Sequence, residues 1–98
     1  MHKPLISIVI NCFNSDEYLK IAIDSAINQT YENWEIIFWD NQSTDESANI
    51  VKSYDDERIN YFYAPVHTPL GEARNLAIEK AKGEWVCILD CDDIWHKN

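Results

Sequence analysis

Three aspartates within four residues near the end of the sequence are the side chains best suited to chemistry. Asp90, Asp92 and Asp93 follow the apolar run 85–88, which has the composition of a buried strand. Crowded carboxylates repel one another, and a bound divalent cation, a hard ion with oxygen ligands, relieves that repulsion. The run predicts a metal site, although Asp92 and Asp93 could instead be solvated loop residues or cap a following turn.

A cationic residue stands near the start of the helical pattern that precedes this run. Arg74 lies in the segment 71–75, and both a helix start and an arginine favour anions. Together with the carboxylates, they would suit a diphosphate held through a metal ion. The alternative is an ordinary surface helix residue paired with Glu72.

Four short apolar runs have the pattern of strands, and the three segments between them have helical periodicity. The predicted strands are 6–10, 35–39, 58–63 and 85–88, and the shorter, more polar third run suits a sheet edge. The predicted caps are Asn14 or Ser15 for the first helix, Ser43 with Glu46 for the second, and Thr68 or Pro69 with a closing Gly83 for the third.

Alternating strands and helices of this kind predict an α/β fold, a three-layer α/β/α arrangement with a mainly parallel sheet of about four strands and three helices. Ligands of such sheets bind outside the carboxyl ends of the strands, where the strand order reverses. Polar residues follow the predicted strands at 11–14, 40–43 and 90–93. We therefore expect the site at this end of the sheet.

Composition limits the partners. The chain has 98 residues, 46% of them hydrophobic, and a formal net charge of −9. This length and apolar content predict a single folded domain over residues 1–98. An acidic domain without clusters of Lys or Arg repels nucleic acid and anionic lipid, whereas a nucleotide can still bind through a cation.

Cysteines, histidines and hydropathy add little to the predicted site. The three cysteines lack CxxC spacing and are interpreted as reduced and structural, which favours a cytoplasmic protein. His2, His67 and His96 share no metal-ligand spacing and are interpreted as surface residues. No apolar run is long enough for a membrane span, and the N-terminus does not resemble a signal peptide.

Several segments together resemble family 2 glycosyltransferases. They occur in that family's order and spacing and cover nearly the whole chain, so their combination is specific although each alone is weak. The segments are 7–10 to Asn14, 29–31, 35–37 to 43–45, 73–75 and 83–84 to Asp93.

The resemblance implies a Rossmann-like GT-A fold, a nucleotide-diphosphate-sugar donor, Mg²⁺ or Mn²⁺, and inversion at the anomeric carbon. The residues that match nucleotide-sugar-binding positions of the family are Asn11, Phe13, Asp40, Asn41, Arg74 and Asp92. Asp90, Asp92 and Asp93 match its DxD motif and are the predicted metal ligands. Two positions also have structural interpretations: Phe13 could be a core residue, and Asp40 could be a turn residue, as Asp45 is expected to be.

Two departures from the family pattern leave the base open. Asn41 stands where the family commonly has an Asp that can accept the uracil imide proton, and Asn offers a donor as well as an acceptor. The first strand ends in the sequence 11–14, Asn-Cys-Phe-Asn, instead of the frequent Pro-Thr-Tyr-Asn. Uridine, thymidine, guanosine and cytidine donors all remain open.

By the same resemblance, the chain is expected to be the donor-binding half of a longer enzyme. The general base is expected beyond Asn98, so residues 1–98 alone are expected to be inactive. The expected acceptor is a glycan or a lipid-linked sugar, as in polysaccharide and cell-envelope biosynthesis. This role is compatible with peripheral association at the inner face of the cytoplasmic membrane, and the shortened domain could self-associate.

Other functions fit less well. A receiver domain needs an acidic pair after the first strand, where this chain has the sequence 11–14, and a P-loop or dinucleotide site needs more than the two glycines present. A sugar-nucleotide nucleotidyltransferase normally has a glycine-rich basic loop. A non-catalytic nucleotide-binding module remains the main alternative.

Overall fold

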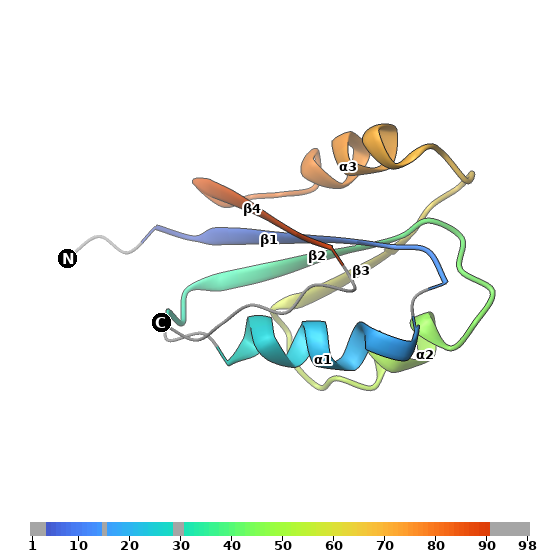
Figure 1. The fold of residues 1–98 in the computed structure, drawn as a ribbon. Helices are drawn as coiled ribbons and strands as arrows, with labels where there is room; N and C mark the ends of the chain where they lie inside the picture. Colours follow the sequence, from blue (N-terminus) through green and yellow to red (C-terminus); the bar gives the residue numbers. More distant parts are fainter. Residues whose placement is uncertain (1–3, 15, 29–30, 91–98) are drawn as a thin grey trace.

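Strands and helices alternate along the chain (Figure 1). The structure is a computed structural model that describes residues 4–14, 16–28 and 31–90. The elements are β1 Ile6–Cys12, α1 Asp16–Ile27, β2 Trp34–Asp40, α2 Ser47–Lys52, β3 Ile59–Tyr63, α3 Leu70–Ile78 and β4 Trp85–Asp90. Each of the seven predicted elements is present.

The four strands form one parallel sheet in the order β3-β2-β1-β4. The chain moves outward from β1 through β2 to β3, then returns to place β4 on the other side of β1. Helices α1 and α2 cover one face of the sheet, and α3 covers the other (Figure 1). The predicted α/β fold is confirmed, with β3 at an edge, and the strand order reverses at β1, where ligands of such sheets bind.

The two central strands, β1 and β2, are buried on both faces, which explains their nearly continuous apolar sequences. Successive side chains of a strand point to opposite faces. Toward α1 and α2 the core contains Ile8, Ile10, Leu19, Ile23, Ile36, Phe38, Val51 and Leu89. Toward α3 it contains Val9, Ile37, Trp39, Ala64, Ala73 and Ala77.

Of the caps predicted for the first two helices, Asn14 and the box of Ser43 and Glu46 are not found. Asn14, at φ 48°, does not cap α1: its Oδ1 accepts a hydrogen bond from the Thr44 N–H (2.7 Å). Ser15, the other predicted cap, lies outside the described residues. The box of Ser43 and Glu46 is also wrong, because Glu46 precedes α2 without a side-chain capping bond and Ser43 Oγ accepts from the Asn14 N–H. The side chains of Asn14 and Ser43 therefore join the loop after β1 to the loop after β2 instead of capping the starts of helices.

Helix α3 follows Pro69, one of the two predicted starts, but ends at Ile78, well before Gly83. Gly83 is therefore not its cap. The Gly83 N–H donates to Ser7 Oγ (2.8 Å), and a Cβ at Gly83 would lie 2.6 Å from the Leu5 carbonyl oxygen. Glycine is required there because the chain passes directly against β1.

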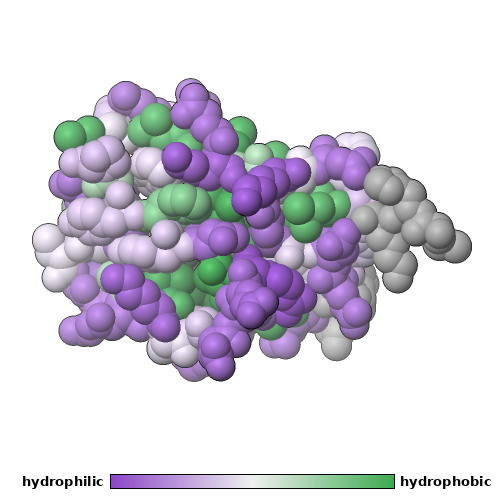
Figure 2. Space-filling view, turned by 180° about the vertical axis from the view of Figure 1, so that it is seen from behind, coloured by the Kyte–Doolittle hydropathy of each residue, from purple (hydrophilic) through white to green (hydrophobic). Residues whose placement is uncertain are grey.

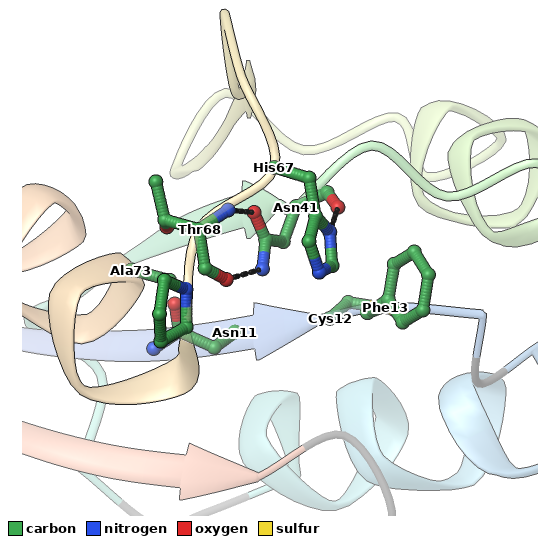
Figure 3. A pocket seen from close by; sticks show the side chains of 8 residues that line it. Asn11, Cys12, Phe13, Asn41, His67, Thr68 and Ala73 are labelled. Carbon is green, nitrogen blue, oxygen red and sulfur yellow. Dashed lines mark hydrogen bonds between the residues drawn. The ribbon is translucent and has the colours of Figure 1, made fainter.

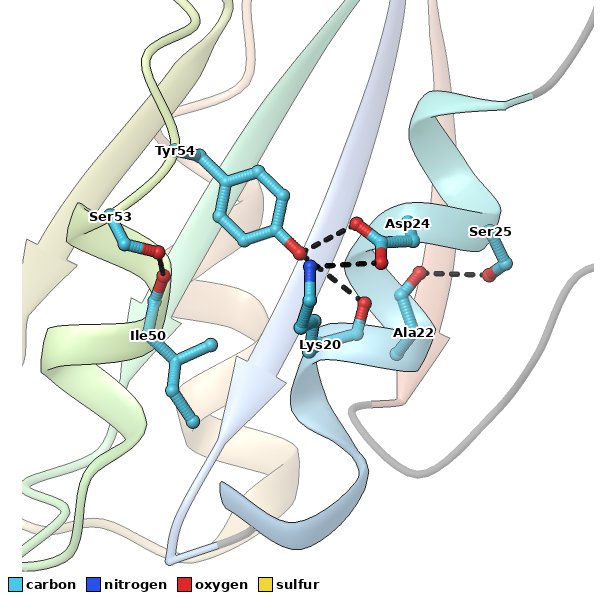
Figure 4. A network of polar contacts seen from close by, with 7 residues as sticks. All are labelled: Lys20, Ala22, Asp24, Ser25, Ile50, Ser53 and Tyr54. Atoms are coloured by element: carbon cyan, nitrogen blue, oxygen red, sulfur yellow. Dashed lines mark hydrogen bonds and ion pairs between the residues drawn. The ribbon is translucent and has the colours of Figure 1, made fainter.

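A polar cluster joins α1 to the chain that leaves α2 (Figure 4). The Tyr54 hydroxyl donates to Asp24 Oδ1 (2.7 Å), and Lys20 pairs with Asp24 Oδ2 (3.2 Å). Burial and the hydrogen bond to Asp24 raise the pKa of the Tyr54 phenol above its ordinary value. The hydroxyl therefore stays protonated and serves as a donor.

Exposed apolar side chains lie at the β4 edge of the sheet. Seen from behind, the surface is mostly hydrophilic, with hydrophobic side chains only in separate areas (Figure 2). At the β4 edge, in contrast, Trp85 is 64% exposed, and Val86 and Ile88 are exposed as well.

Within the described chain, no helix combines the length and the apolar character that crossing a bilayer requires.

Candidate functional site

A cavity of about 310 Å³ opens at the carboxyl ends of β1 and β2 (Figure 3). The ends of β1 and β2, the loop 64–69 and the first turn of α3 surround it. Its lining residues are Asn11, Cys12, Phe13, Asn41, His67, Thr68, Pro69 and Ala73. The cavity thus brings together three of the residues that the sequence predicted, Asn11, Phe13 and Asn41.

Asn41 holds one wall of this cavity together. Its Nδ2 donates to the Thr68 carbonyl oxygen (2.7 Å), and its Oδ1 accepts from the Thr68 N–H (3.0 Å), so the side-chain amide pairs with both backbone groups of one residue (Figure 3). The Asn41 N–H donates to the Cys12 carbonyl oxygen (2.8 Å). These bonds fix the loop 64–69 against the ends of β1 and β2.

Two other lining residues have buried polar atoms without partners. Asn11 is 6% exposed and Thr68 is 7% exposed. Among the described residues, nothing hydrogen-bonds to Asn11 Oδ1, Asn11 Nδ2 or Thr68 Oγ1. Because buried polar groups are normally paired, three such atoms around one cavity indicate a ligand that has both donors and acceptors.

Two aromatic rings form the outer rim. Phe13 is 48% exposed, which excludes the core interpretation of this residue. Its ring centroid is 4.6 Å from that of His67, and the ring planes are inclined by 60°. An exposed aromatic face at a cavity mouth can stack against a planar ligand. Sequence reasoning placed His67 on the surface, where it is, but missed its place at this cavity, because only the fold brings the loop 64–69 beside β1.

Asp40 ends β2, next to the lining residue Asn41, but does not line the cavity. Its side chain has no exposed surface; Oδ1 accepts from the Ser43 N–H (2.7 Å), and Oδ2 accepts from the Tyr61 hydroxyl (2.5 Å). Burial and the hydrogen bond to Asp40 raise the pKa of the Tyr61 phenol. This geometry gives Asp40 the turn role considered from the sequence, and contact with a nucleotide stays a prediction.

The remaining predicted residues lie around the same end of the sheet or beyond the described part. Arg74 is half-buried on α3, next to the lining residue Ala73. The backbone of Asp90 pairs with Asn11 at the end of β4. Asp92 and Asp93 fall outside the described residues, and within those described no group of three His, Cys, Asp or Glu could hold a metal ion. The metal site stays a prediction.

Comparison with known proteins identifies the family. The sequence model of the family described as "Glycosyl transferase family 2" matches residues 7–98. The chain belongs to glycosyltransferase family 2. It is 37% identical over 98 residues to TuaG of Bacillus subtilis, a glycosyltransferase assigned to teichuronic acid biosynthesis, and this match covers 98% of the chain and 39% of TuaG.

A second family 2 relative is WfgD of Escherichia coli, a UDP-Glc:α-D-GlcNAc-diphosphoundecaprenol β-1,3-glucosyltransferase. It is 34% identical over 98 residues, which are 100% of this chain and 39% of WfgD. The chain thus spans about two fifths of the length of these curated relatives.

Solved structures confirm the GT-A architecture. The complex of S. aureus TarS residues 1–349 with UDP matches with a TM-score of 0.89 and 27% identity over 95% of this chain and 29% of that chain. The mannosyltransferase PcManGT of Pyrobaculum calidifontis, crystallised with GDP-Man and Mn²⁺, matches with a TM-score of 0.87 and 23% identity over 96% of this chain and 29% of its own. At 23% identity, the match to PcManGT supports the fold alone.

Proposed function

We propose that residues 1–98 bind the uridine diphosphate part of a sugar donor and act as the donor-binding half of an inverting glycosyltransferase. The observation that carries the proposal is the cavity with three unpaired buried polar atoms, on Asn11 and Thr68, at the switch point of a family 2 fold. TarS has been crystallised with UDP and with UDP-GlcNAc, and the name of WfgD specifies UDP-Glc. These likenesses favour uridine among the four bases.

In the proposed complex the base enters the cavity and packs against Phe13. Asn11 offers one amide donor and one acceptor, and Thr68 Oγ1 offers a hydroxyl, so the ligand would satisfy atoms that have no partner within the described chain. The diphosphate then lies toward β4 and α3, where Arg74 contributes positive charge. Asn41 holds the loop 64–69 through Thr68, and Asp40 holds the turn after β2 through the Ser43 N–H.

The metal is a separate part of the proposal. Asp90, Asp92 and Asp93 would hold Mg²⁺ or Mn²⁺, which supplies positive charge to the diphosphate leaving group. The support within this chain is the pairing of Asp90 with Asn11, which starts the acidic run beside a residue that lines the cavity. Oxygen-only ligands of this kind suit these hard ions.

For the acceptor, we propose a lipid-linked or glycan hydroxyl at the cytoplasmic membrane face; the name of WfgD specifies a diphosphoundecaprenol-linked acceptor, and that of TuaG refers to teichuronic acid biosynthesis. Peripheral association with the membrane would follow from such an acceptor. The exposed apolar side chains of β4 support self-association of the 98-residue chain, which sedimentation velocity over a concentration series would detect.

Amide NMR titration tests the proposal. The ¹⁵N-labelled chain is titrated with UDP, dTDP, GDP and CDP, each with and without Mg²⁺. We expect UDP to shift Asn11, Phe13 and Thr68, and Mg²⁺ to extend the shifts to Asp90. Tyr54, on the opposite side of the sheet, is the internal control. If millimolar concentrations of all four nucleotides leave the cavity residues unshifted in a folded chain, the proposal is wrong.

A further inference from the structure

His67 has a defined hydrogen-bonding state in this structure. Its Nδ1 lies 2.9 Å from the backbone carbonyl oxygen of Asn41. A carbonyl oxygen can only accept, so Nδ1 must carry the hydrogen and donate it. In a neutral imidazole with hydrogen on Nδ1, Nε2 keeps its lone pair and is an acceptor.

That acceptor is available at the cavity. The described residues supply no hydrogen bond to Nε2, and Figure 3 shows the second ring nitrogen on the side of the ring turned away from the Asn41 oxygen. The Phe13 ring stands next to it at 4.6 Å between centroids. A base stacked on Phe13 would therefore present its edge within reach of Nε2.

Asn41, in contrast, already uses both of its side-chain polar atoms to hold the loop 64–69. Its amide nitrogen and its amide oxygen both pair with the backbone of Thr68. An amide offers a donor as well as an acceptor, whereas a ring nitrogen fixed as an acceptor discriminates between bases. Uracil, thymine and guanine carry a ring N–H on their pairing edge, whereas cytosine and adenine carry a ring-nitrogen lone pair there.

We propose that His67 selects the donor base: Nε2 accepts a hydrogen bond from the ring N–H of uracil, and the lone pair of cytosine is rejected. This inference rests on the proposed binding of uridine diphosphate and assigns its base specificity to one side chain. The bond from Nδ1 to the Asn41 backbone oxygen fixes the tautomer of His67. The discrimination between bases therefore depends on how the fold places the loop 64–69 against the residue that follows β2.

Isothermal titration calorimetry with UDP and with CDP tests the assignment on the wild-type chain, His67→Phe and Val66→Ala. Phenylalanine keeps an aromatic ring beside Phe13 but removes Nε2. Val66 lies in the same loop, is 60% exposed and does not line the cavity, so Val66→Ala is the matched control. We expect the wild type and the control to prefer UDP by about 10-fold, the usual value of one discriminating hydrogen bond.

In His67→Phe, we expect that preference to fall to about 2-fold or less, mainly through weaker UDP binding. A purely structural role of His67 would weaken UDP and CDP equally and leave the ratio unchanged, which would overturn the inference. If neither nucleotide binds the wild type, the proposed function fails together with the inference. If nucleotides bind but His67→Phe keeps the ratio, only the inference fails.

A measurement on the wild type guards against a variant that does not fold. Long-range ¹H–¹⁵N NMR of the histidine ring reports which nitrogen carries the hydrogen. We expect His67 to show hydrogen on Nδ1, and the Nε2 resonance to move on addition of UDP but not CDP. Hydrogen on Nε2 in the free chain, or equal responses to both nucleotides, would overturn the assignment.

Discussion

Both sides of the sheet carry polar groups at its carboxyl end but differ in how these groups are paired. On the side of α1 and α2, Asn14, Asp16, Ser43 and Asp45 form a loop network in which side chains of one loop bond backbone groups of the other. On the side of α3, the cavity leaves polar atoms of Asn11 and Thr68 without partners among the described residues. The difference separates a polar cluster that supports the fold from one that we propose binds a ligand.

Nearly all the polar groups named in the loop network have hydrogen-bond partners within the network. The Asp16 N–H donates to Asp45 Oδ2 and the Glu46 N–H donates to Asp16 Oδ2, both at 3.2 Å, while the Ser47 N–H donates to Asp45 Oδ1 (2.9 Å). The one buried exception is Ser47 Oγ. Acidic residues alone therefore do not indicate a binding site here, because the carboxylates of Asp16 and Asp45 accept hydrogen bonds from backbone N–H groups.

The largest effect is expected at Asp40, the fully buried carboxylate at the end of β2. Asp40→Ala leaves the buried Tyr61 hydroxyl and the Ser43 N–H without their acceptor, which should lower the free energy of unfolding by about 3 kcal/mol. Urea denaturation followed by tryptophan fluorescence measures this. The matched control Tyr61→Phe removes one of the two bonds and should cost about 1 kcal/mol. Equal losses in the two variants would show that Asp40 has no wider supporting role.

The comparison makes its sharpest prediction at Asn11. Asn11→Leu replaces an unpaired buried amide by an apolar side chain of similar size, so it should raise the free energy of unfolding by about 1 kcal/mol. The same change removes a proposed ligand contact and should weaken UDP binding by about 10-fold or more. Denaturation and calorimetry on one preparation measure both. A destabilised variant that still binds UDP would mean that Asn11 belongs to the supporting cluster.

A pH dependence is expected from Asp45. Burial opposes ionisation, but hydrogen bonds from Ser47 and from the Asp16 N–H outweigh it and hold the pKa below its ordinary value of 3.8. A carboxyl whose pKa is lower when folded stabilises the fold above its unfolded pKa and loses that contribution as the pH falls. Asp45→Asn should therefore cost about 1 kcal/mol at pH 7 and progressively less as the pH falls below 3.8.

Urea titrations of Asp45→Asn and of the wild type at pH 7, 5 and 3 measure this difference. Asp55, for which the structure gives no hydrogen bond to another described residue, offers Asp55→Asn as the control. A cost that stays constant over the three pH values would contradict the role given to the Asp45 carboxylate.

The smallest effect is expected at Thr68. Thr68→Val keeps the shape but removes Oγ1, the third unpaired atom, and should change the free energy of unfolding by less than about 0.5 kcal/mol. UDP binding should weaken by roughly 3- to 10-fold. Because Thr68 contacts Asn41 through its backbone, that pair survives the substitution. An unchanged UDP affinity would remove Thr68 from the proposed contacts.

The fold was predictable where sequence patterns are long. The apolar runs of β1 and β2 predicted buried parallel strands because no other placement hides both faces, and the strand ends predicted which end of the sheet carries the site. Capping residues were not predictable. Asn14 and Ser43 have side chains suited to local bonds, but their partners come from a loop about 30 residues away, which no local pattern encodes.

The site was predictable in part for the same reason. Asn11, Phe13 and Asn41 follow strands and so could be placed at the cavity from their sequence positions alone. His67 follows an edge strand by several residues, and only the path of the loop 64–69 brings its ring beside Phe13. Asp40 and Asn41 are neighbours in sequence, yet Asp40 is buried against Tyr61 and Asn41 lines the cavity.

The contact of Gly83 with β1 has a consequence at the far end of the sheet. Glu35 Oε2 accepts hydrogen bonds from Ser7 Oγ (2.6 Å) and from the Lys82 N–H (2.7 Å), and the Gly83 N–H donates to Ser7 Oγ. These bonds, together with a space at Gly83 that is too small for a Cβ, fix the position at which β4 begins beside β1. A slip of one residue would put Leu89 opposite Asn11 in place of Asp90. The alignment of the acidic run is thus fixed before the strand begins, by groups that no nucleotide would touch.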